Sequence, residues 1–404
     1  MAEIERGMPD TDRVLALLND AFDGWGDEDF LRWKYAQYPG FDPDEHVFYI
    51  ERNGELAAFR RVFEKELLVE DSRISGFVLG DTSVAKAHRG QGLYSQLHST
   101  TVEHCREIGA ELVYTFNRTN NVTFAANRKR GWRYHTLPLQ MRILSAKPVL
   151  SEYVDLVLGD WQRVKRAVDL VGNRVALVVG GERVPVSAFG TARSGEGSAK
   201  RSLAVPLPAS IVRRLVRAFG RQSTEDTMKT LVGLSGDDQF DSTNPAASDL
   251  EAIDVTETAT PDDYERVRSL YDDVRPSNPA FRREIEDIRH LCQFPAGSRA
   301  VFAERSGELC GFAVLGTVQN GAVTECRVLD IVATDAAPFR RLVDAIERSA
   351  ADRDHDLVVL LSERDAGRRW TPIRKQVVMW DRVDNRPEAE RLDRDWHVGL
   401  YDAV

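Results

Sequence analysis

Hydrophobic and polar positions alternate along the first 143 residues in a way that predicts helices and strands in regular succession. Val14, Leu18 and Phe22 repeat at helical spacing after Pro9, which predicts an amphipathic helix. Asn53-Gly54 separates two strand-like runs and predicts a two-residue hairpin. In chain order, the predicted elements are a strand at 4–8, helices from 11 and at 27–35, strands at 47–51, 56–63 and 77–84, a helix from 93 to 108, a strand at 111–116, a helix at 121–130, and one or two strands within 132–143.

The same order of elements recurs from about residue 250, although the sequence itself does not repeat. The predicted elements there are a strand at 252–255, a helix opened by Thr260-Pro261, a second helix at 279–292, strands at 300–304 and 310–315, a strand at 328–332, a helix at 339–350 and a strand at 357–361. The stretch between holds a strand-like piece at 175–179, a helix starting near 210 and a polar linker at 237–249. We therefore divide the chain into residues 1–145, an intervening region 146–249 whose fold the pattern does not assign, and residues 250–404.

Composition narrows the class of protein. The 404 residues carry a formal charge of −10, with 42% hydrophobic and 29% charged residues, which is typical of a globular chain with no nucleic-acid partner. No run approaches the roughly 20 apolar residues of a membrane span, and the charged N-terminus does not resemble a signal peptide. The four cysteines form no CxxC pair, which argues against zinc or any other metal site and against a disulfide framework. The expected location is the cytoplasm, with no membrane partner.

A glycine-bearing turn between the strand at 77–84 and the next helix carries the clearest chemical signal. Gly90 and Gly92 come directly before the helix, so the unpaired first-turn amides and the positive helix end face one point. Phosphate is the anion that such a turn commonly binds. An ordinary strand-to-helix turn is the alternative interpretation. The spacing matches neither GxxxxGK[ST] nor GxGxxG.

The segment Arg89-Gly90-Gln91-Gly92-Leu93-Tyr94 resembles the acyl-CoA pyrophosphate loop of the GNAT superfamily of N-acyltransferases, whose pattern is Arg/Gln-x-x-Gly-x-Gly/Ala. Val84 lies where that family has the apolar end of its fourth strand. Asn120, eleven residues before Gly131-Trp132, matches the family's Asn…Gly-Phe stretch. The resemblance implies an α/β (α+β) GNAT fold, a mixed and mostly antiparallel twisted sheet flanked by helices, present twice in the chain.

The resemblance also implies a binding mode for acetyl-CoA, or another acyl-CoA, as co-substrate. Backbone amides from Gly90 to Ser95 would hold the diphosphate, the strand end would pair with the pantetheine arm, and Asn120 would touch that arm. The basic run 127–130 is interpreted either as a site for the 3′-phosphate or as a solvated cluster. The residues expected at the cofactor are Thr82, Ser83, Val84, Arg89, Gly90, Gln91, Gly92, Leu93, Tyr94, Ser95 and Asn120.

The catalytic groups are less clear from the sequence. The position of the family's usual general-acid tyrosine, four residues before the Gly-aromatic pair, falls on Asn127, which can hydrogen-bond a thiolate but cannot protonate it. Tyr94, Tyr114 and Tyr134 are alternative acids. Asp81 is the only carboxylate in its strand and is the candidate general base, although an aspartate satisfied by neighbouring groups is equally compatible.

The second repeat lacks the phosphate turn, because Asp335 and Pro338 stand where the first repeat has its arginine and glycines. We therefore expect a degenerate GNAT-like domain without CoA. The leading hypothesis is an N-acetyltransferase acting by direct attack of a primary amine, of a small molecule or peptide. A non-catalytic acyl-CoA-binding regulator and an aminoacyl-transferase-like tandem protein are the alternatives. A homo-oligomer is left open, and the acidic stretch 23–29 is interpreted as an acceptor contact or a solvated turn.

Overall fold

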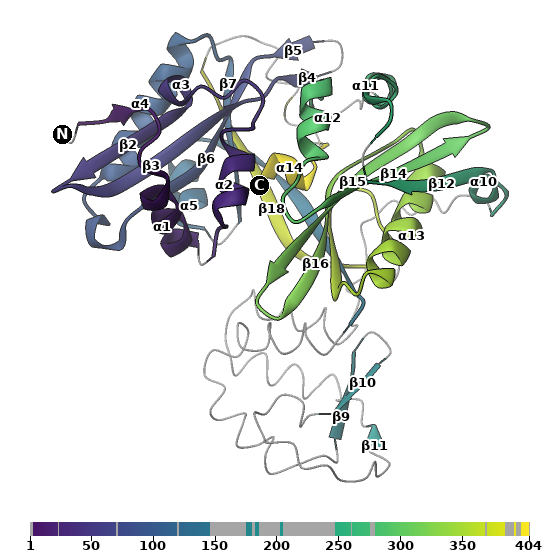
Figure 1. The fold of residues 1–404 in the computed structure, drawn as a ribbon. Helices are drawn as coiled ribbons and strands as arrows, with labels where there is room; N and C mark the ends of the chain where they lie inside the picture. The colour runs from purple at the N-terminus through teal and green to yellow at the C-terminus, as the bar shows by residue number, and fades with distance from the viewer. Residues whose placement is uncertain are drawn as a thin grey trace.

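The computed structural model describes residues 3–145 apart from 23, 70–71 and 119–120, three short strands within 175–204, and residues 247–403 apart from 260, 275–278, 368–369, 384–391 and 393–396. We call residues 3–145 the N-terminal half and residues 247–403 the C-terminal half. Figure 1 shows them side by side, with the C-terminus between them. The expected α/β fold with a large, mostly antiparallel sheet flanked by helices is confirmed.

The N-terminal half follows the predicted order closely. Its elements are β1 (Glu5–Arg6), α1 (Thr11–Phe22), α2 (Glu28–Lys34), α3 (Pro43–His46), β2 (Val47–Arg52), β3 (Glu55–Glu64), β4 (Leu67–Val69), β5 (Ser72–Ile74), β6 (Gly76–Val84), a 3₁₀ turn η1 (Lys86–His88), α4 (Leu93–Glu107), β7 (Leu112–Arg118), α5 (Val122–Lys129) and β8 (Arg133–Ile143). Asn53 and Gly54 both have positive φ, as the predicted hairpin turn requires. The short strands β4 and β5 were not predicted.

The C-terminal half repeats this order. Its elements are α10 (Ala247–Glu251), β12 (Ile253–Thr258), α11 (Tyr264–Asp273), β13 (Ala280–Phe281), α12 (Ile285–Leu291), β14 (Ser298–Arg305), β15 (Glu308–Asn320), β16 (Val323–Ala333), α13 (Ala336–Asp352), β17 (Leu357–Leu361), β18 (Thr371–Arg382) and α14 (Leu400–Ala403). The helix predicted at 279–292 is shorter, since its first residues form β13 and Glu284 opens α12 with a capping box. Between the halves, β9 (Val175–Val179), β10 (Glu182–Pro185) and β11 (Leu203–Ala204) form a small sheet, and the helix predicted near 210 lies outside the described residues.

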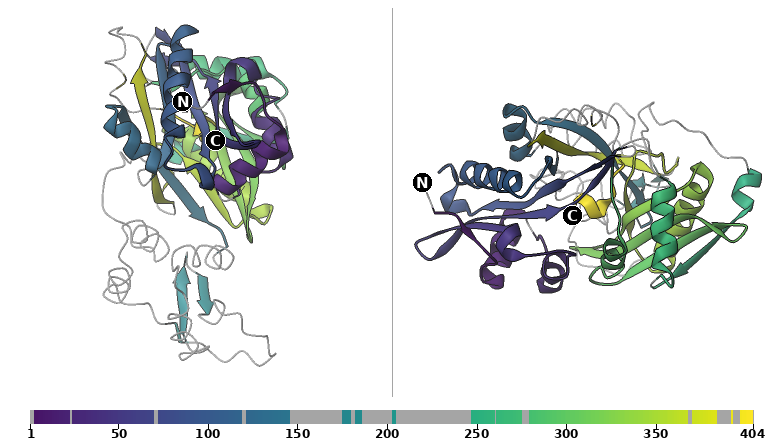
Figure 2. Two further views of the ribbon diagram at one scale, coloured as in Figure 1. Left: turned by 90° about the vertical axis from the view of Figure 1, so that its left-hand side faces the viewer. Right: turned by 90° about the horizontal axis from the view of Figure 1, so that it is seen from above.

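The two halves exchange their last strands and share one sheet. The order is β1-β2-β3-β6-β7-β18-β8-β17-β16-β15-β14-β12, in which only β6/β7 and β16/β17 are parallel. β18 from the C-terminal half lies between β7 and β8, and β8 pairs with β17 on its other side. Both views in Figure 2 show β18 (yellow) among the blue strands of the N-terminal half. From one edge the strands run β1-β2-β3-β6-β7-β18, and from the other edge their counterparts run β12-β14-β15-β16-β17-β8. The predicted duplication therefore takes the form of one continuous sheet. The boundaries at 145 and 250 stay a prediction.

Helices cover both faces of the N-terminal half. Leu93 and Leu97 of α4 pack with Val113 and Trp132 on one face. Leu18 of α1 and the helix α2 pack on the opposite face. The strands between are therefore covered on both sides, and every residue of β3 from Leu56 to Phe63 is buried, including Arg60 and Arg61.

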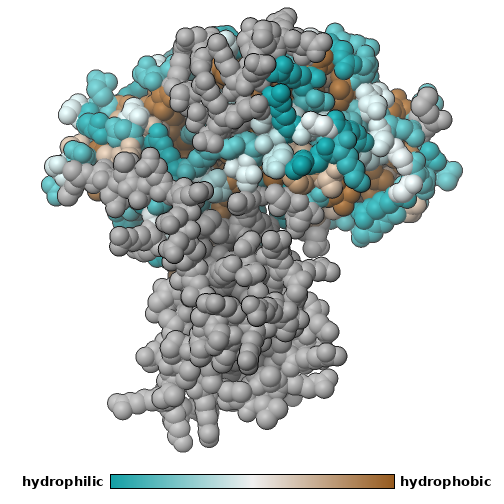
Figure 3. Space-filling model, turned by 180° about the vertical axis from the view of Figure 1, so that it is seen from behind, coloured by the Kyte–Doolittle hydropathy of each residue, from teal (hydrophilic) through white to brown (hydrophobic). Residues whose placement is uncertain are grey.

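On the face that Figure 3 shows, hydrophobic residues are interspersed with hydrophilic ones over the described parts of both halves. Among the residues that the structure describes, four large hydrophobic side chains are exposed, all of them in the N-terminal half: Phe22, Ile108, Val122 and Tyr134. None of the helices within the described ranges is both long enough and apolar enough to cross a bilayer.

Candidate functional site

The two parallel strands β6 and β7 separate part-way along their length. They pair from Gly76 with Leu112 to Val78 with Tyr114, and from Leu79 onward β6 keeps hydrogen-bonded pairs only with β3. The ends of the two strands therefore diverge, and beyond Val78 one edge of β6 has no neighbouring strand. A bulge in the β3/β6 ladder between Phe59 and Arg61 bends β6 at the same level.

The predicted glycine turn lies directly at the end of this opening. Gly90 and Gly92 have φ of +76° and +78°, a region that favours glycine, and Gly92 is the N-cap of α4 without any side-chain cap. A Cβ atom built on either glycine would meet nothing within 4 Å. The first turn of α4 thus has no side-chain cap for its backbone N–H groups, and no side chain fills the space at the two glycines, as an anion site requires.

Polar side chains surround this turn. Arg89 folds back, with its Nε donating to the Val84 carbonyl at 3.2 Å. Arg130 Nη2 donates to Ser95 Oγ at 3.2 Å, so a cation of the basic run 127–130 lies beside the predicted diphosphate position. Ser83 Oγ is buried without a hydrogen-bond partner. An orphaned hydroxyl at the diverging edge of β6 fits a ligand that brings its own polar groups, as a pantetheine arm does. Asn120 lies outside the described residues.

Asn127 is held in the slot between α4 and α5. Its side chain is 1% exposed, and its Oδ1 accepts a hydrogen bond from the hydroxyl of Tyr94 at 3.1 Å. The other two candidate acids are placed differently: Tyr114 is fully buried and donates to the Lys65 carbonyl at 2.8 Å, and Tyr134 is exposed beside Phe124. Of the three tyrosines, Tyr94 is the one whose hydroxyl lies beside Asn127, where the resembled family has its tyrosine.

The guanidinium group of a buried arginine, Arg60, lies over the ring of Tyr94. Arg60 on β3 is 1% exposed, and its Nε donates to Thr82 Oγ1 at 2.8 Å. Its Nη1 lies 3.4 Å from Nδ1 of His98, whose ring stacks on Tyr94. Burial, with the nearby Arg60 and Arg130, lowers the pKa of His98 to about 3, so this imidazole is neutral and its Nδ1 accepts from Arg60. The sequence did not single out Arg60.

Asp81 lies on the opposite face of the sheet from Thr82. Its φ is +47°, and it occupies the bulge of β6. One carboxylate oxygen accepts from Lys34 Nζ at 2.7 Å and from Trp25 Nε1 at 3.1 Å, and the other accepts from the Tyr35 hydroxyl at 2.9 Å. Burial lowers the pKa of Lys34, although Asp81 opposes that shift, and burial with Asp81 raises the pKa of Tyr35 well above its usual value. None of these three partners was identified from the sequence.

Residues 8–135 match the family model described as an acetyltransferase (GNAT) domain. Residues 8–135 are therefore GNAT-like. The structure is also similar to solved structures. A GCN5-related N-acetyltransferase from Anabaena variabilis ATCC 29413 has a TM-score of 0.54 at 9% identity, over 95% of this chain and 73% of that one. N-myristoyltransferase from Saccharomyces cerevisiae, with bound myristoyl-CoA, has a TM-score of 0.53 at 12% identity, over 96% and 80%. A probable N-acyltransferase from Enterococcus faecalis V583 has a TM-score of 0.52 at 10% identity, over 95% and 73%. At these identities the likeness shows the fold alone, and none of the curated proteins searched matches the sequence.

The C-terminal half has the same strand divergence as the N-terminal half but not its glycine turn. β16 and β17 pair only from Glu325 to Val328 on the β16 side. At the start of α13, Asp335 accepts a hydrogen bond from the Ala337 amide at 2.9 Å and lies 3.2 Å from Arg305. Pro338 has no amide hydrogen to offer. The helix end that would face a phosphate is therefore already capped by a carboxylate.

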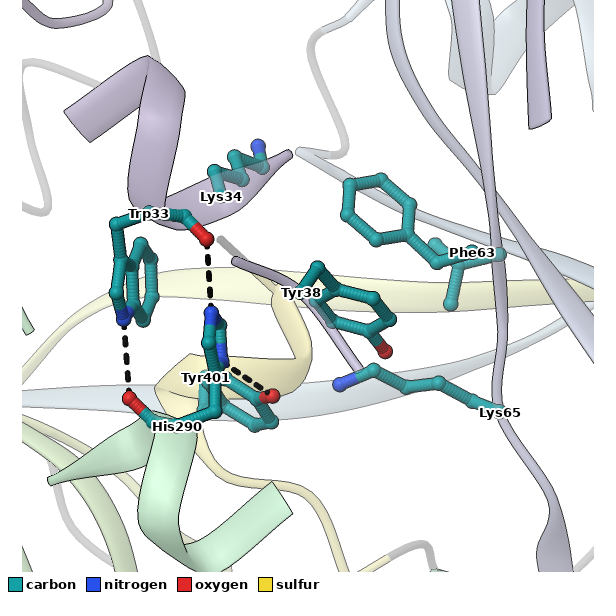
Figure 4. Close-up of a pocket in the computed structure, with 8 residues that line it drawn as sticks. Trp33, Lys34, Tyr38, Phe63, Lys65, His290 and Tyr401 are labelled. Atoms are coloured by element: carbon teal, nitrogen blue, oxygen red, sulfur yellow. Dashed lines mark hydrogen bonds between the residues drawn. The ribbon is translucent and has the colours of Figure 1, made fainter. Parts of the chain in front are cut away.

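Two cavities lie where the halves meet. The smaller, of about 20 Å³, is enclosed by Trp33, Tyr38, Lys65, His290 and Tyr401 among others (Figure 4). The larger, of about 300 Å³, lies at the end of β16, and the ion pair of Arg283 with Asp330 at 2.8 Å forms part of its wall. Within the described ranges, no group of three or more His, Cys, Asp or Glu side chains is arranged to hold a metal ion.

Proposed function

We propose that this chain is an acetyl-CoA-dependent N-acetyltransferase that transfers the acyl group to a primary amine of a small molecule or peptide by direct attack. The observation that supports the proposal most strongly is the uncapped start of α4, with two left-handed glycines beside the diverging ends of β6 and β7. A GNAT domain with this turn intact supports an acyltransferase. We also propose a cytoplasmic location, because the four cysteines are free and buried.

The residues around the turn fit an acyl-CoA. Amides from Gly90 to Ser95 would bind the diphosphate, with Arg130 close enough to add a positive charge. The edge of β6 at Thr82, Ser83 and Val84, which has no neighbouring strand on the β7 side, would pair with the pantetheine amides in the manner of an added strand. The larger Tyr94 side chain leaves the amides open because its ring lies against His98.

Little covalent chemistry is needed from the protein. The acyl carbon has to be held in line with the amine, the carbonyl polarised, and one proton removed from the ammonium. Asp81 as the general base stays a prediction. Because three donors already hold its carboxylate, the geometry favours a role in shaping the acceptor side, with water removing the proton.

Calorimetric titration of acetyl-CoA into the whole chain tests the binding site. We expect Gly92→Asp to weaken binding by about 100-fold or more, since it sets a carboxylate against the diphosphate at the same amides. Gly92→Ala is the matched control, because it imposes the same positive φ on an L-residue without adding charge. Equal binding by wild type and Gly92→Asp would mean that the cofactor lies elsewhere.

Free-thiol release from acetyl-CoA with a panel of amines tests the reaction. Thiol release that depends on an amine supports the acetyltransferase, and acyl-CoAs of increasing chain length then measure the acyl preference. Asn127 in place of the usual tyrosine supports the second candidate function, a non-catalytic acyl-CoA-binding regulator. Tight CoA binding without thiol release across the panel would favour that candidate.

A further inference from the structure

The hydroxyl of Tyr94 bridges the opening at which the acyl thioester is expected. α4 packs on β2, β3 and β6, and α5 packs on β7, so the two helices lie on either side of the diverging strands. The hydrogen bond of 3.1 Å from Tyr94 to Asn127 Oδ1 joins these helices. Asn127 is too short to reach further, and Tyr94, from the neighbouring helix, places its phenol oxygen in the same slot.

We propose that Tyr94 is the general acid of this enzyme and that Asn127 is the positioning residue that holds its hydroxyl. The inference rests on the proposed acyltransferase function. The family pattern places the general acid on α5, at the position of Asn127, whereas this inference places it on α4, at Tyr94. Asn127 accepts the phenol hydrogen in the resting site, which keeps the hydroxyl in the slot until a thiolate forms there.

The surroundings of the ring suit proton donation. The guanidinium carbons of Arg60 and Arg130 each lie 5.4 Å from the centre of the Tyr94 ring. Arg60 is buried, and His98, stacked on the ring, is neutral, so both nearby charges are positive. Both positive charges therefore lie beside the ring on which negative charge would develop as the proton leaves. Arg60 is itself fixed by Thr82, so the charge cannot move away.

The step balances without a further reactant. The amine nitrogen bonds to the thioester carbon, and the resulting tetrahedral intermediate collapses with cleavage of the carbon–sulfur bond. The sulfur takes the electron pair and receives the proton from Tyr94. Solvent returns a proton to the phenolate, and the proton that the amine has lost goes to water.

Steady-state kinetics with the best amine of the panel is the first test. We expect Tyr94→Phe to lower kcat by about 100-fold, with the KM for acetyl-CoA within about twofold. The double variant Tyr94→Phe/Asn127→Tyr returns a hydroxyl to the same slot from α5, and we expect it to regain at least a tenth of the lost activity. Tyr134→Phe is the matched control, since that hydroxyl lies at the exposed edge, and its rate should not change. An unchanged rate in Tyr94→Phe would overturn the proposal.

A binding measurement separates this proposal from the proposed function. Tyr94 should make CoA bind about fivefold more tightly than desulfo-CoA, and Tyr94→Phe should abolish that preference. If wild type prefers CoA to desulfo-CoA but transfers no acyl group, the contact between Tyr94 and the sulfur is supported and the proposed acetyltransferase function is wrong. CoA binding without the preference in wild type would overturn the assignment of Tyr94. Failure to bind CoA at all would overturn both.

Discussion

The indole of Trp33 and the imidazole of His290 stack with their ring centres 4.6 Å apart and their planes 6° from parallel (Figure 4). Trp33 Nε1 donates to the His290 carbonyl at 3.0 Å, and His290 Nε2 donates to the Trp33 carbonyl at 2.8 Å. The pair joins α2 to α12, two helices at equivalent places in the two halves. Tyr401 completes it with a hydroxyl 2.9 Å from His290 Nδ1. The halves are thus joined by side chains as well as by shared strands.

This arrangement makes stability depend on pH. Burial lowers the pKa of His290 to about 4, with Lys65 and Arg61 adding to the shift and the bond to the Trp33 carbonyl opposing it. In the unfolded chain its pKa is about 6.5, so the unfolded state binds the proton first as pH falls. The free energy of unfolding should therefore decrease from about pH 6.5 down to about pH 4, by roughly 3 kcal/mol from this residue.

Urea unfolding at a series of pH values measures this decrease. His290→Gln should reduce the slope, while the share due to buried His98 remains because its pKa is lowered in the same direction. The same slope in wild type and His290→Gln would show that His290 is not the group concerned.

Asp81→Asn should destabilise the protein, because it leaves the buried ammonium of Lys34 without its counter-charge. Both side chains of this ion pair are at most 7% exposed, and breaking such a pair by removing one partner costs about 3–5 kcal/mol. Thermal and urea unfolding check the loss. The matched double variant Asp81→Asn/Lys34→Met removes both charges and should recover most of the stability.

The same double variant decides the catalytic role of Asp81. If the carboxylate shapes the acceptor side, acyl transfer should return together with stability. If it removes the proton from the amine, the double variant should fold and stay slower by about 10²–10⁴-fold.

Acetyl-CoA should bind once per chain. In the second half the start of α13 is capped by Asp335, which is paired with Arg305, and Pro338 lacks an amide hydrogen. Calorimetry should give a stoichiometry of one, and Pro338→Ala should leave affinity and stoichiometry unchanged. Two molecules per chain would contradict this account of the second half.

Residues 1–145 alone should not form the GNAT domain. β8 has β18 and β17 as its two neighbours in the sheet, and both come from the C-terminal half. The isolated segment should therefore show poorly dispersed amide NMR signals. Co-expression of residues 1–145 with 247–404 is the control, and the two pieces should purify together. A well-folded, CoA-binding 1–145 would show that the shared strands are dispensable.

Local features of the fold could be predicted from the sequence, and contacts between distant segments could not. The hairpin at Asn53-Gly54 and the turn at Gly90 and Gly92 depend on a few neighbouring residues, so their signals are complete within a short window. β18 was missed, since its segment begins with Thr371-Pro372 and polar residues, and its place depends on strands more than 200 residues away.

In the candidate site, too, local features could be predicted from the sequence and contacts between distant residues could not. The motif pointed to the glycine turn before α4, whose phosphate-binding role stays a prediction, and showed that Asn127 stands where the resembled family has a tyrosine. It could not reveal that Tyr94 fills the slot, because that bond joins residues 33 positions apart on different helices. The partners of Asp81 are 46 to 56 residues distant from it, so the sequence showed an aspartate in a strand but not the three donors that hold it.

Because the halves exchange their last strands, the sheet of the N-terminal half cannot be completed until β18 has been synthesised. The N-terminal half emerges from the ribosome with its phosphate turn, yet the strand that lies between β7 and β8 begins only at Thr371. At roughly 5–20 residues per second, the ribosome needs about 10–50 s to pass from β8 to β18. During that interval the edge of β7 and both edges of β8 are unpaired and open to other chains. The sheet around the proposed acyl-CoA site is therefore completed only when almost the whole chain has been made.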